Sequence, residues 1–317
     1  MYAIDWAVRK ELRVYDVKKE KVKTISSTVP EFAKFLTSIK KPTNFYFEEG
    51  GGDSFKLLAR RKGHEVHTIL GKKTKEYRDN LGVEKSDEAD AVIIGQMAKS
   101  QPDEFYQFRE LDEVTARISI LFKERADTEE NLVRQKNKLF ALKNRLELIN
   151  LDGYKDKVIE RKQDIIDALE KEFELQTKLL GKEVEKHPAW TNYLKDIKGV
   201  GAAVGAGLIA RIKRASRFTD KYSLRHFAGM IQKKGNQQFD HKLKRTLYHF
   251  TEEIIKQRTP VWRELYDNIK EFYKGKHPDW SKGKVNNFAK KFVQTKFLDS
   301  VFEKMIEIEK DAREGVQ

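Results

Sequence analysis

The sequence predicts an α/β domain followed by helical domains. Residues 1 to about 100 alternate short apolar strands with helical patterns. From about residue 111, leucine and isoleucine recur at helical spacing among dense charged residues, and the remainder reads as shorter helices separated by glycine-rich turns. We expect three domains: an α/β domain at 1–108, a long helical coiled-coil region at 109–186 and an all-helical domain at 187–317.

The first domain opens with three predicted strands, at 2–6, 12–17 and 21–25, the first two joined as a hairpin across 7–11. A helix is expected from Pro30 to Ile39, because its aromatic and aliphatic residues share one face and proline favours a first turn.

The α/β pattern then continues with a fourth strand at 45–48, a glycine run at 50–52, a helix through Phe55 and Leu58 that ends at Gly63, and a fifth strand at 65–70. Three antiparallel strands followed by helix, strand, helix and strand predict a mixed sheet flanked by helices.

An acid-rich segment, Ser86–Ala91, is predicted to open the next helix. Ser86 is in position to cap it, and Asp87 and Asp90 are three residues apart, which puts both carboxylates on one face. Like charges this close repel, and a divalent cation would offset that repulsion far more than the helix N-terminus does. The alternative is an ordinary solvated first turn.

Two further carboxylates, Asp5 and Glu48, end the first and fourth predicted strands. If these strands lie side by side, both carboxylates reach the same edge of the sheet, and the helix carrying Asp87 and Asp90 can pack across it. The four side chains would then form one acidic pocket. Glu49 is the rival of Glu48, although strand alternation favours Glu48.

Carboxylate oxygens are the ligands that Mg²⁺ or Mn²⁺ prefers. Two such ions, ~3.5–4 Å apart, can activate an attacking oxygen and stabilise the leaving oxygen of a phosphodiester. The chain has no cysteine, which excludes disulfides and thiolate metal sites.

Nearly all of the net charge of +14 comes from the C-terminal part, since residues 186–317 hold 28 Lys and Arg against 15 Asp and Glu. A polyanion, and nucleic acid above all, is the natural partner. A Lys-rich surface of a protein from a hot environment is the alternative. Because no signal peptide or long apolar run is evident, we expect a soluble cytoplasmic protein without membrane contact.

The region 111–185 reads as two long amphipathic helices with a break near Asp152–Tyr154. A helical hairpin or coiled coil for self-association is one interpretation, and a basic arm that also touches nucleic acid is the other.

A glycine-rich turn at 197–203 opens a helix predicted for 204–212, and unpaired backbone N–H groups at such a turn can hold a phosphate. A turn needed only for close helix packing is the alternative. The candidate nucleic-acid contacts are Lys198, Gly199, Gly201, Lys213, Arg214, Lys233, Lys234, Lys242, Lys244 and Arg245.

Eight aromatic residues follow between positions 262 and 297. Most are expected in the core, and any left exposed beside lysines could stack on unpaired bases.

These features together resemble the DEDD transposases of insertion sequences, the group that includes the Piv DNA invertase and the bridge-RNA-guided recombinases. The resemblance covers most of the chain, and the acidic signature is its specific part. Its elements are Ile4-Asp5, Glu48 with Gly51, Gly63–Val66, Ser86–Ala91, Ile197–Gly201, Arg217-Phe218 and Phe227–Met230.

The resemblance implies a RuvC-like (RNase H-like) first domain, a coiled-coil insertion and a C-terminal transposase domain that binds DNA through a helix-hairpin-helix-like element. It implies that Asp5, Glu48, Asp87 and Asp90 are the catalytic and metal-binding residues. It also implies a homodimer or homotetramer, a structured noncoding guide RNA and a place at a prokaryotic nucleoid.

The chain departs from this family at one point. The family supplies a nucleophilic serine shortly after the segment that corresponds to Phe227–Met230, whereas residues 230–245 contain no Ser or Thr. The nearest hydroxyls are Ser223, Thr246 and the more distant Ser281. The nucleophile therefore stays unassigned.

The leading hypothesis is a transposase or recombinase that cleaves and rejoins DNA at a Mg²⁺-dependent acidic site. Two alternatives stay open: a structure-selective RuvC-like endonuclease, and a domesticated transposase kept as a non-catalytic nucleic-acid-binding protein.

Overall fold

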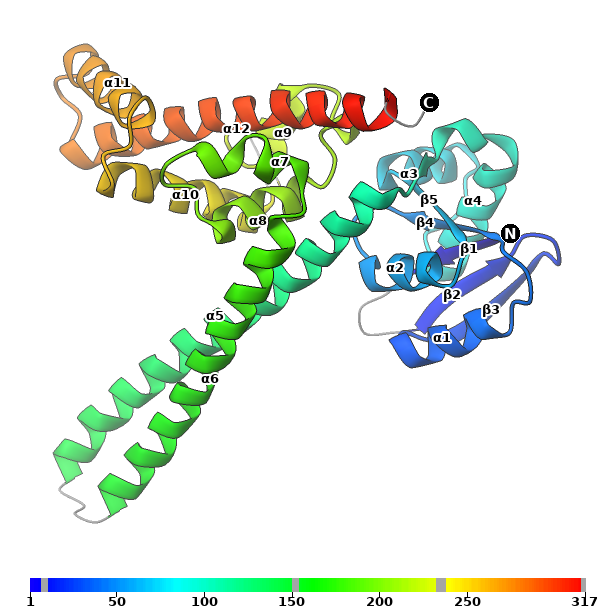
Figure 1. The fold of residues 1–317 in the computed structure, drawn as a ribbon, viewed down its shortest axis with the longest axis horizontal. Helices are drawn as coiled ribbons and strands as arrows, with labels where there is room; N and C mark the ends of the chain where they lie inside the picture. The colour runs from blue at the N-terminus through cyan, green and yellow to red at the C-terminus, as the bar shows by residue number, and fades with distance from the viewer. Residues whose placement is uncertain (7–10, 150–153, 232–237, 315–317) are drawn as a thin grey trace. The chain divides into compact units, whose positions relative to one another are not determined.

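The computed structural model describes residues 1–6, 11–149, 154–231 and 238–314. The chain divides into two compact units, Met1–Ala116 and Arg117–Gln317 (Figure 1). The first unit is a sheet with helices on both faces, and the second is helical throughout its described residues. The predicted fold class, α/β followed by helices, is confirmed.

The sheet has the strand order β3-β2-β1-β4-β5-β6. The first strand pairs antiparallel with β2 and parallel with β4, so the expected adjacency of the first and fourth predicted strands is confirmed. The strands are β1 (Tyr2–Asp5), β2 (Glu11–Asp16), β3 (Lys21–Ser26), β4 (Asn44–Glu48), β5 (Glu65–Ile69) and β6 (Tyr106–Gln107).

Side-chain alternation on β4 separates the two faces of the sheet. Phe45 packs edge-on against Phe32 of α1 (Val29–Thr37), which in turn contacts Phe55 of α2 (Asp53–Arg61). The next residue, Tyr46, belongs to a buried cluster that includes Ala91 of α4 (Asp87–Ser100). The helix that carries the acidic segment therefore covers the face opposite α1 and α2.

The sequence did not predict α3 (Gly71–Asn80), the short strand β6 or the 3₁₀ turn at Pro102–Glu104. Thr74 and Arg78 are buried on α3. A helix whose buried face is polar leaves no apolar periodicity to read.

In the second unit, the two long helices α5 (Glu110–Ile149) and α6 (Tyr154–Val184) form an antiparallel pair along the residues from 117 on (Figure 1). Leu132 and Leu139 of α5 are buried against Ile166 of α6. An ion pair of 2.7 Å joins Lys136 to Glu170 at the same level. Residues 150–153, where most of the predicted break falls, lie outside the described residues.

The remaining helices pack around α10 and α12. The rings of Phe250 and Phe297 stack with their centroids 3.6 Å apart, and Trp262 meets both edge-on. No helix in the described ranges is long and apolar enough to cross a membrane. The helices are α7 (Pro188–Thr191), α8 (Ala202–Ile212), α9 (Lys221–Phe227), α10 (His241–Lys256), α11 (Trp262–Lys276) and α12 (Lys282–Glu314).

Candidate acidic site and nucleic-acid interface

Asp5 and Glu48 lie at one edge of the sheet because their strands run parallel and in register. Ile4 is the partner of Phe47 across β1 and β4, and Asp5 and Glu48 each follow directly as the last residue of their strand. Parallel strands end at the same edge, so the two carboxylates leave the sheet side by side. Glu49 lies one residue further, where its backbone N–H donates to Ile69.

Asp87 and Asp90 reach the same place from the first turn of α4. Ser86 caps this helix as predicted, since its Oγ accepts a hydrogen bond of 3.0 Å from the backbone N–H of Ala89. Asp90 is only 8 % exposed and Asp87 is half-buried. Burial of this kind rules out an ordinary solvated turn for Asp90.

The other three carboxylates act electrostatically on Asp5. Burial raises the pKa of the Asp5 carboxyl to about 7, and the negative charges of Asp90, Asp87 and Glu48 push it in the same direction, against a smaller opposite effect of Lys85. A carboxylate surrounded by other carboxylates is hard to ionise because each added charge repels the rest. The site therefore holds more negative charge than its own surroundings neutralise.

The unpredicted helix α3 supplies the partners of two of these carboxylates. Arg78 forms a buried ion pair with Asp90. The Thr74 hydroxyl donates a 2.9 Å hydrogen bond to Glu48 Oε2. Gly71 opens the helix directly against the Glu48 carboxylate, and a Cβ there would collide with it. Sequence reasoning missed these residues, and their only signal was that Thr74 and Arg78 are four apart on one helix face.

The donor set suits Mg²⁺ or Mn²⁺, because its four acidic residues offer only carboxylate oxygens and three of them are half-buried. As placed, no three His, Asp or Glu side chains of the described residues are close enough to hold one metal ion. The carboxylates thus share one electrostatic environment without being assembled into a ligand set.

The glycine-rich turn before α8 combines close packing with an open helix end. Gly199 has a φ of +94°, and a Cβ there would lie 3.3 Å from Ile254 and Thr259, so this glycine is required by packing. Gly201 caps α8 with nothing within 4 Å of its Cβ position, and Lys198 is exposed beside it. Packing therefore accounts for Gly199 but not for Gly201.

Two of the predicted cationic contacts are already paired with α5. Lys242 lies 3.8 Å from Asp127, and Arg245 lies 3.9 Å from Glu129. Both pairs are partly exposed, and exposed pairs contribute little, so a phosphate can replace the carboxylate at small cost.

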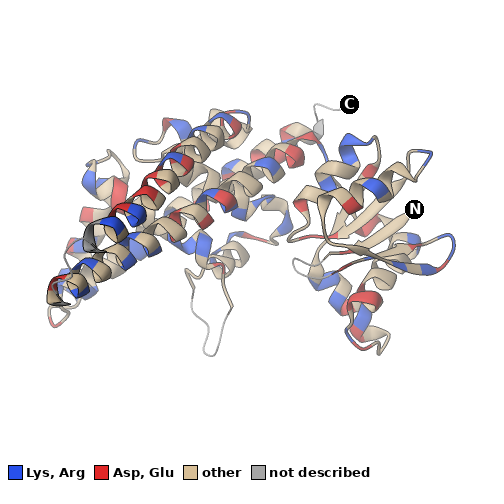
Figure 2. Cartoon of the chain, turned by 90° about the horizontal axis from the view of Figure 1, so that it is seen from below, with Lys and Arg blue, Asp and Glu red and all other residues tan. Residues whose placement is uncertain are grey.

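The other predicted contacts differ in their surroundings. Lys244 covers the ring of Phe239 at 4.6 Å. Lys213 and Arg214 are half-buried at the end of α8. Lys233 and Lys234 lie outside the described residues. Along the helical unit, Lys and Arg are interspersed with Asp and Glu (Figure 2).

The three candidate hydroxyls differ in their surroundings, and Thr246 is the one that is buried. Thr246 is 5 % exposed and donates to the backbone oxygen of Lys242. Ser281 Oγ accepts from the backbone N–H of Lys284 at the start of α12. Ser223 is half-buried in the first turn of α9.

Two protein-family models match stretches of this sequence. Residues 3–146 match a family model described as "Transposase", that of the DEDD transposases of the IS110 type. Residues 191–267 match a second model, described as "Transposase IS116/IS110/IS902 family". No curated protein matches the chain. The first match contains all four carboxylates, the second contains the glycine-rich turn, and together they cover more than half of the sequence. The chain therefore belongs to the IS110 family of DEDD transposases and is a DNA transposase.

Proposed function

We propose that this transposase cleaves and rejoins DNA at a divalent-metal-dependent site formed by Asp5, Glu48, Asp87 and Asp90. The observation that carries the proposal is that Asp5 and Glu48 end neighbouring parallel strands in register, and the pKa of Asp5, raised to about 7 by burial and by the other three carboxylates, supports it. Surplus negative charge at a sheet edge destabilises the fold. Groups whose pKa is perturbed in this way are typical of functional sites.

The four carboxylates would hold the ion, and each has a distinct environment. Asp5 would be one ligand and lies in the field of the other three carboxylates, Thr74 orients Glu48, and Arg78 holds Asp90 by a buried ion pair. A bound Mg²⁺ or Mn²⁺ would supply activation of the attacking oxygen and stabilisation of the leaving oxygen. Binding requires the side chains to move closer than they stand here, and relief of their mutual repulsion favours that movement.

The helical unit would bind the DNA backbone. Lys198 and the open start of α8 at Gly201 offer a cation and unpaired N–H groups to one phosphate, and Lys242, Lys244 and Arg245 lie together on α10. Gly199 would shape the turn, while Lys213, Arg214, Lys233 and Lys234 would add sequence-independent attraction.

The resemblance to bridge-RNA-guided recombinases extends the proposal to a structured noncoding RNA that pairs with DNA, and to assembly as a homodimer or homotetramer through α5 and α6. RNA that copurifies with the protein and survives high-salt washing supports the first part. The second part is supported if the mass in solution corresponds to two or four chains and falls to that of one chain when contacts between the α5 and α6 helices of different chains are disrupted.

Cleavage of DNA carrying the ends of the element tests the acidic site. Wild-type protein with Mg²⁺ is expected to cut, and the Asp87→Ala, Asp90→Ala double variant is expected to lose activity. Glu88→Ala is the matched control, because Glu88 is exposed in the same helical turn. Unchanged cleavage by the double variant would show that the acidic-site mechanism is wrong.

The nucleophile can be identified from the reaction products. A covalent protein–DNA adduct would indicate a hydroxyl nucleophile elsewhere in the chain. Products with free 3′-hydroxyl and 5′-phosphate ends, without an adduct, indicate that the acidic site acts alone, as the endonuclease alternative requires. The absence of Ser and Thr from residues 230–245 favours the second outcome.

A further inference from the structure

A hairpin joins the end of α11 to the start of α12 (Figure 1). Five aromatic side chains on and beside this hairpin contact one another. We call this group the tip cluster: Phe272, Tyr273, His277, Trp280 and Phe288. The rings of His277 and Trp280 lie parallel, 4.0 Å apart with an interplanar angle of 4°. Tyr273 is stacked on Trp280 at 5.9 Å, and Phe288 closes the group at 4.6 Å from Trp280.

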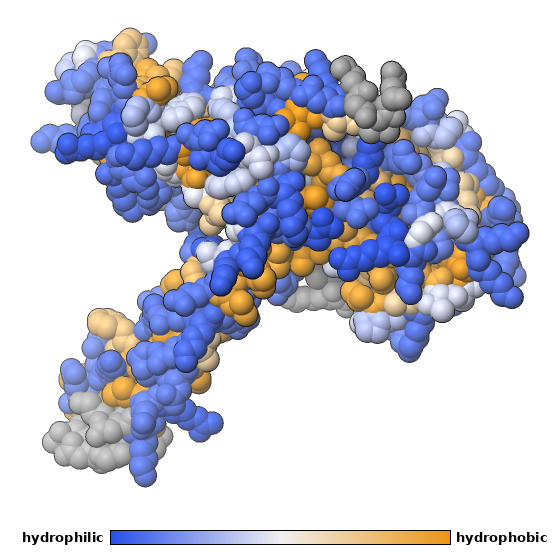
Figure 3. Space-filling view, in the orientation of Figure 1, coloured by the Kyte–Doolittle hydropathy of each residue, from blue (hydrophilic) through white to orange (hydrophobic). Residues whose placement is uncertain are grey.

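Two residues of the tip cluster are exposed and the other three are half-buried, so these are the aromatics that the sequence left as candidates for stacking beside lysines. Phe272 is 56 % exposed and Phe288 is 41 % exposed, while Trp280 is half-buried. Hydrophobic and strongly hydrophilic residues lie side by side over this part of the surface (Figure 3). The exposed rings of Phe272 and Phe288 lie beside half-buried rings, which makes this group a candidate binding surface.

Positive charge surrounds the exposed rings. Residues 270–291 contain seven lysines and two acidic residues, Glu271 and Asp279. Lys284 lies 4.0 Å above the Trp280 ring and Lys276 lies 5.6 Å from the Phe272 ring. Among the described residues, neither of these two lysines has a carboxylate partner. The surface therefore combines planar apolar faces with cations.

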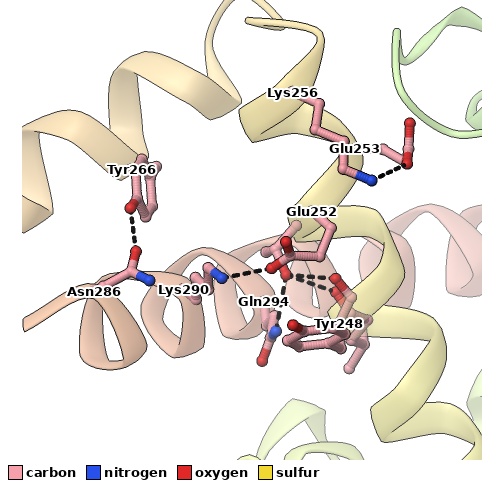
Figure 4. Close-up of polar contacts among 10 residues, drawn as sticks. Tyr248, Glu252, Glu253, Lys256, Tyr266, Asn286, Lys290 and Gln294 are labelled. Atoms are coloured by element: carbon pink, nitrogen blue, oxygen red, sulfur yellow. Dashed lines mark hydrogen bonds and ion pairs between the residues drawn. The ribbon is translucent and has the colours of Figure 1, made fainter. Parts of the chain in front are cut away.

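The base of the hairpin is held firmly to α10. Tyr266 of α11 hydrogen-bonds Asn286 of α12, Lys290 pairs with Glu252, and Gln294 donates a 2.9 Å hydrogen bond to Thr251 (Figure 4). These contacts fix α12 against both neighbouring helices. The tip is thus a preorganised platform, and binding to it loses little conformational freedom.

We propose that the tip cluster binds unpaired bases of single-stranded DNA. A base has a planar face of its own, so aromatic rings accept it by stacking, and flanking lysines attract the adjoining phosphates without regard to sequence. A transposase opens and exchanges DNA strands, which supplies this ligand. The second family match ends at residue 267, so the tip cluster lies outside the matched residues. An acidic protein surface fits the lysines but gives the stacked rings no specific role.

Binding of the full-length protein to a fluorescent oligothymidylate of about 20 nucleotides tests the proposal. Trp280→Ala and the Phe272→Ala, Phe288→Ala pair are each expected to weaken binding by about fivefold to a hundredfold. Tyr222→Ala is the matched control, because Tyr222 is 51 % exposed on α9, away from the tip, and should leave affinity unchanged.

Two further measurements separate stacking from a structural effect. Trp280→Phe should keep most of the affinity but lose the part of the tryptophan quenching that oligothymidylate causes in the wild type. Affinity for a duplex of equal length should change less than twofold in all the tip variants, since paired bases offer no free face.

The proposal is overturned if the tip variants bind oligothymidylate as the wild type does, or lose duplex binding equally. Binding of oligouridylate but not oligothymidylate would assign the surface to RNA instead. Self-association that depends on Trp280, without single-strand binding, would make it a protein interface.

Discussion

Replacing Asp5 with asparagine should stabilise the α/β unit at neutral pH. Burial and three neighbouring carboxylates raise the pKa of Asp5 from 3.8 to about 7. Three pKa units correspond to ~4 kcal/mol. Because Asp5 is partly exposed, solvent screening reduces this figure, and a gain of about 2 kcal/mol is expected.

The sign follows from proton binding. Between about pH 4 and pH 7 the folded state keeps a proton on Asp5 that the unfolded state has released, so the unfolding free energy falls as the pH rises through that window. Below the unfolded pKa both states are protonated and the full stability is present. The asparagine variant carries no such charge, and its stability should change less over the same window.

Hydrogen exchange of the β1 and β4 amides, at about pH 5 and about pH 8 without divalent ions, reports on this unit alone. The advantage of Asp5→Asn should appear in full at the higher pH and fall to less than half of that at the lower one, because the unfolded-state pKa of 3.8 lies below pH 5. Glu88→Gln, an exposed change on α4, is the control. A variant no more stable than wild type at the higher pH would refute the argued convergence of charge on Asp5.

Three other outcomes follow from the same structure. Gly71→Ala should destabilise the protein by about 1–3 kcal/mol in thermal denaturation, because its Cβ collides with the Glu48 carboxylate. Arg78→Gln should cost about 3 kcal/mol by leaving Asp90 buried without its cation, and added Mg²⁺ should recover part of the loss. DNA affinity measured from about 50 to about 200 mM salt should fall steeply, and Lys198→Ala should reduce the slope by about one; a flat salt dependence contradicts the backbone contacts.

The frame of the acidic site could be predicted from local patterns. Strand alternation and the crossover rule placed Asp5 beside Glu48, and the cap Ser86 fixed the start of α4. These features depend on residues near one another in sequence or on a topology with few alternatives.

The parts that could not be predicted depend on contacts between distant residues. Arg78 is buried only because Asp90 lies opposite, and Lys242 meets Asp127 across 115 positions of sequence. Phe272 is exposed because it lies near the end of α11, beyond the part of the helix that is packed. Its apolar residue type alone would have predicted burial. Hydrophobic periodicity records none of these pairings.

Calorimetric titration with Mn²⁺ tests the central proposal most directly, because it measures metal binding without requiring the DNA substrate. Wild type and Glu88→Ala should bind the ion, and the Asp87→Ala, Asp90→Ala variant should not. The same heat of binding in all three proteins, or none in the wild type, would contradict a metal-dependent site formed by Asp5, Glu48, Asp87 and Asp90.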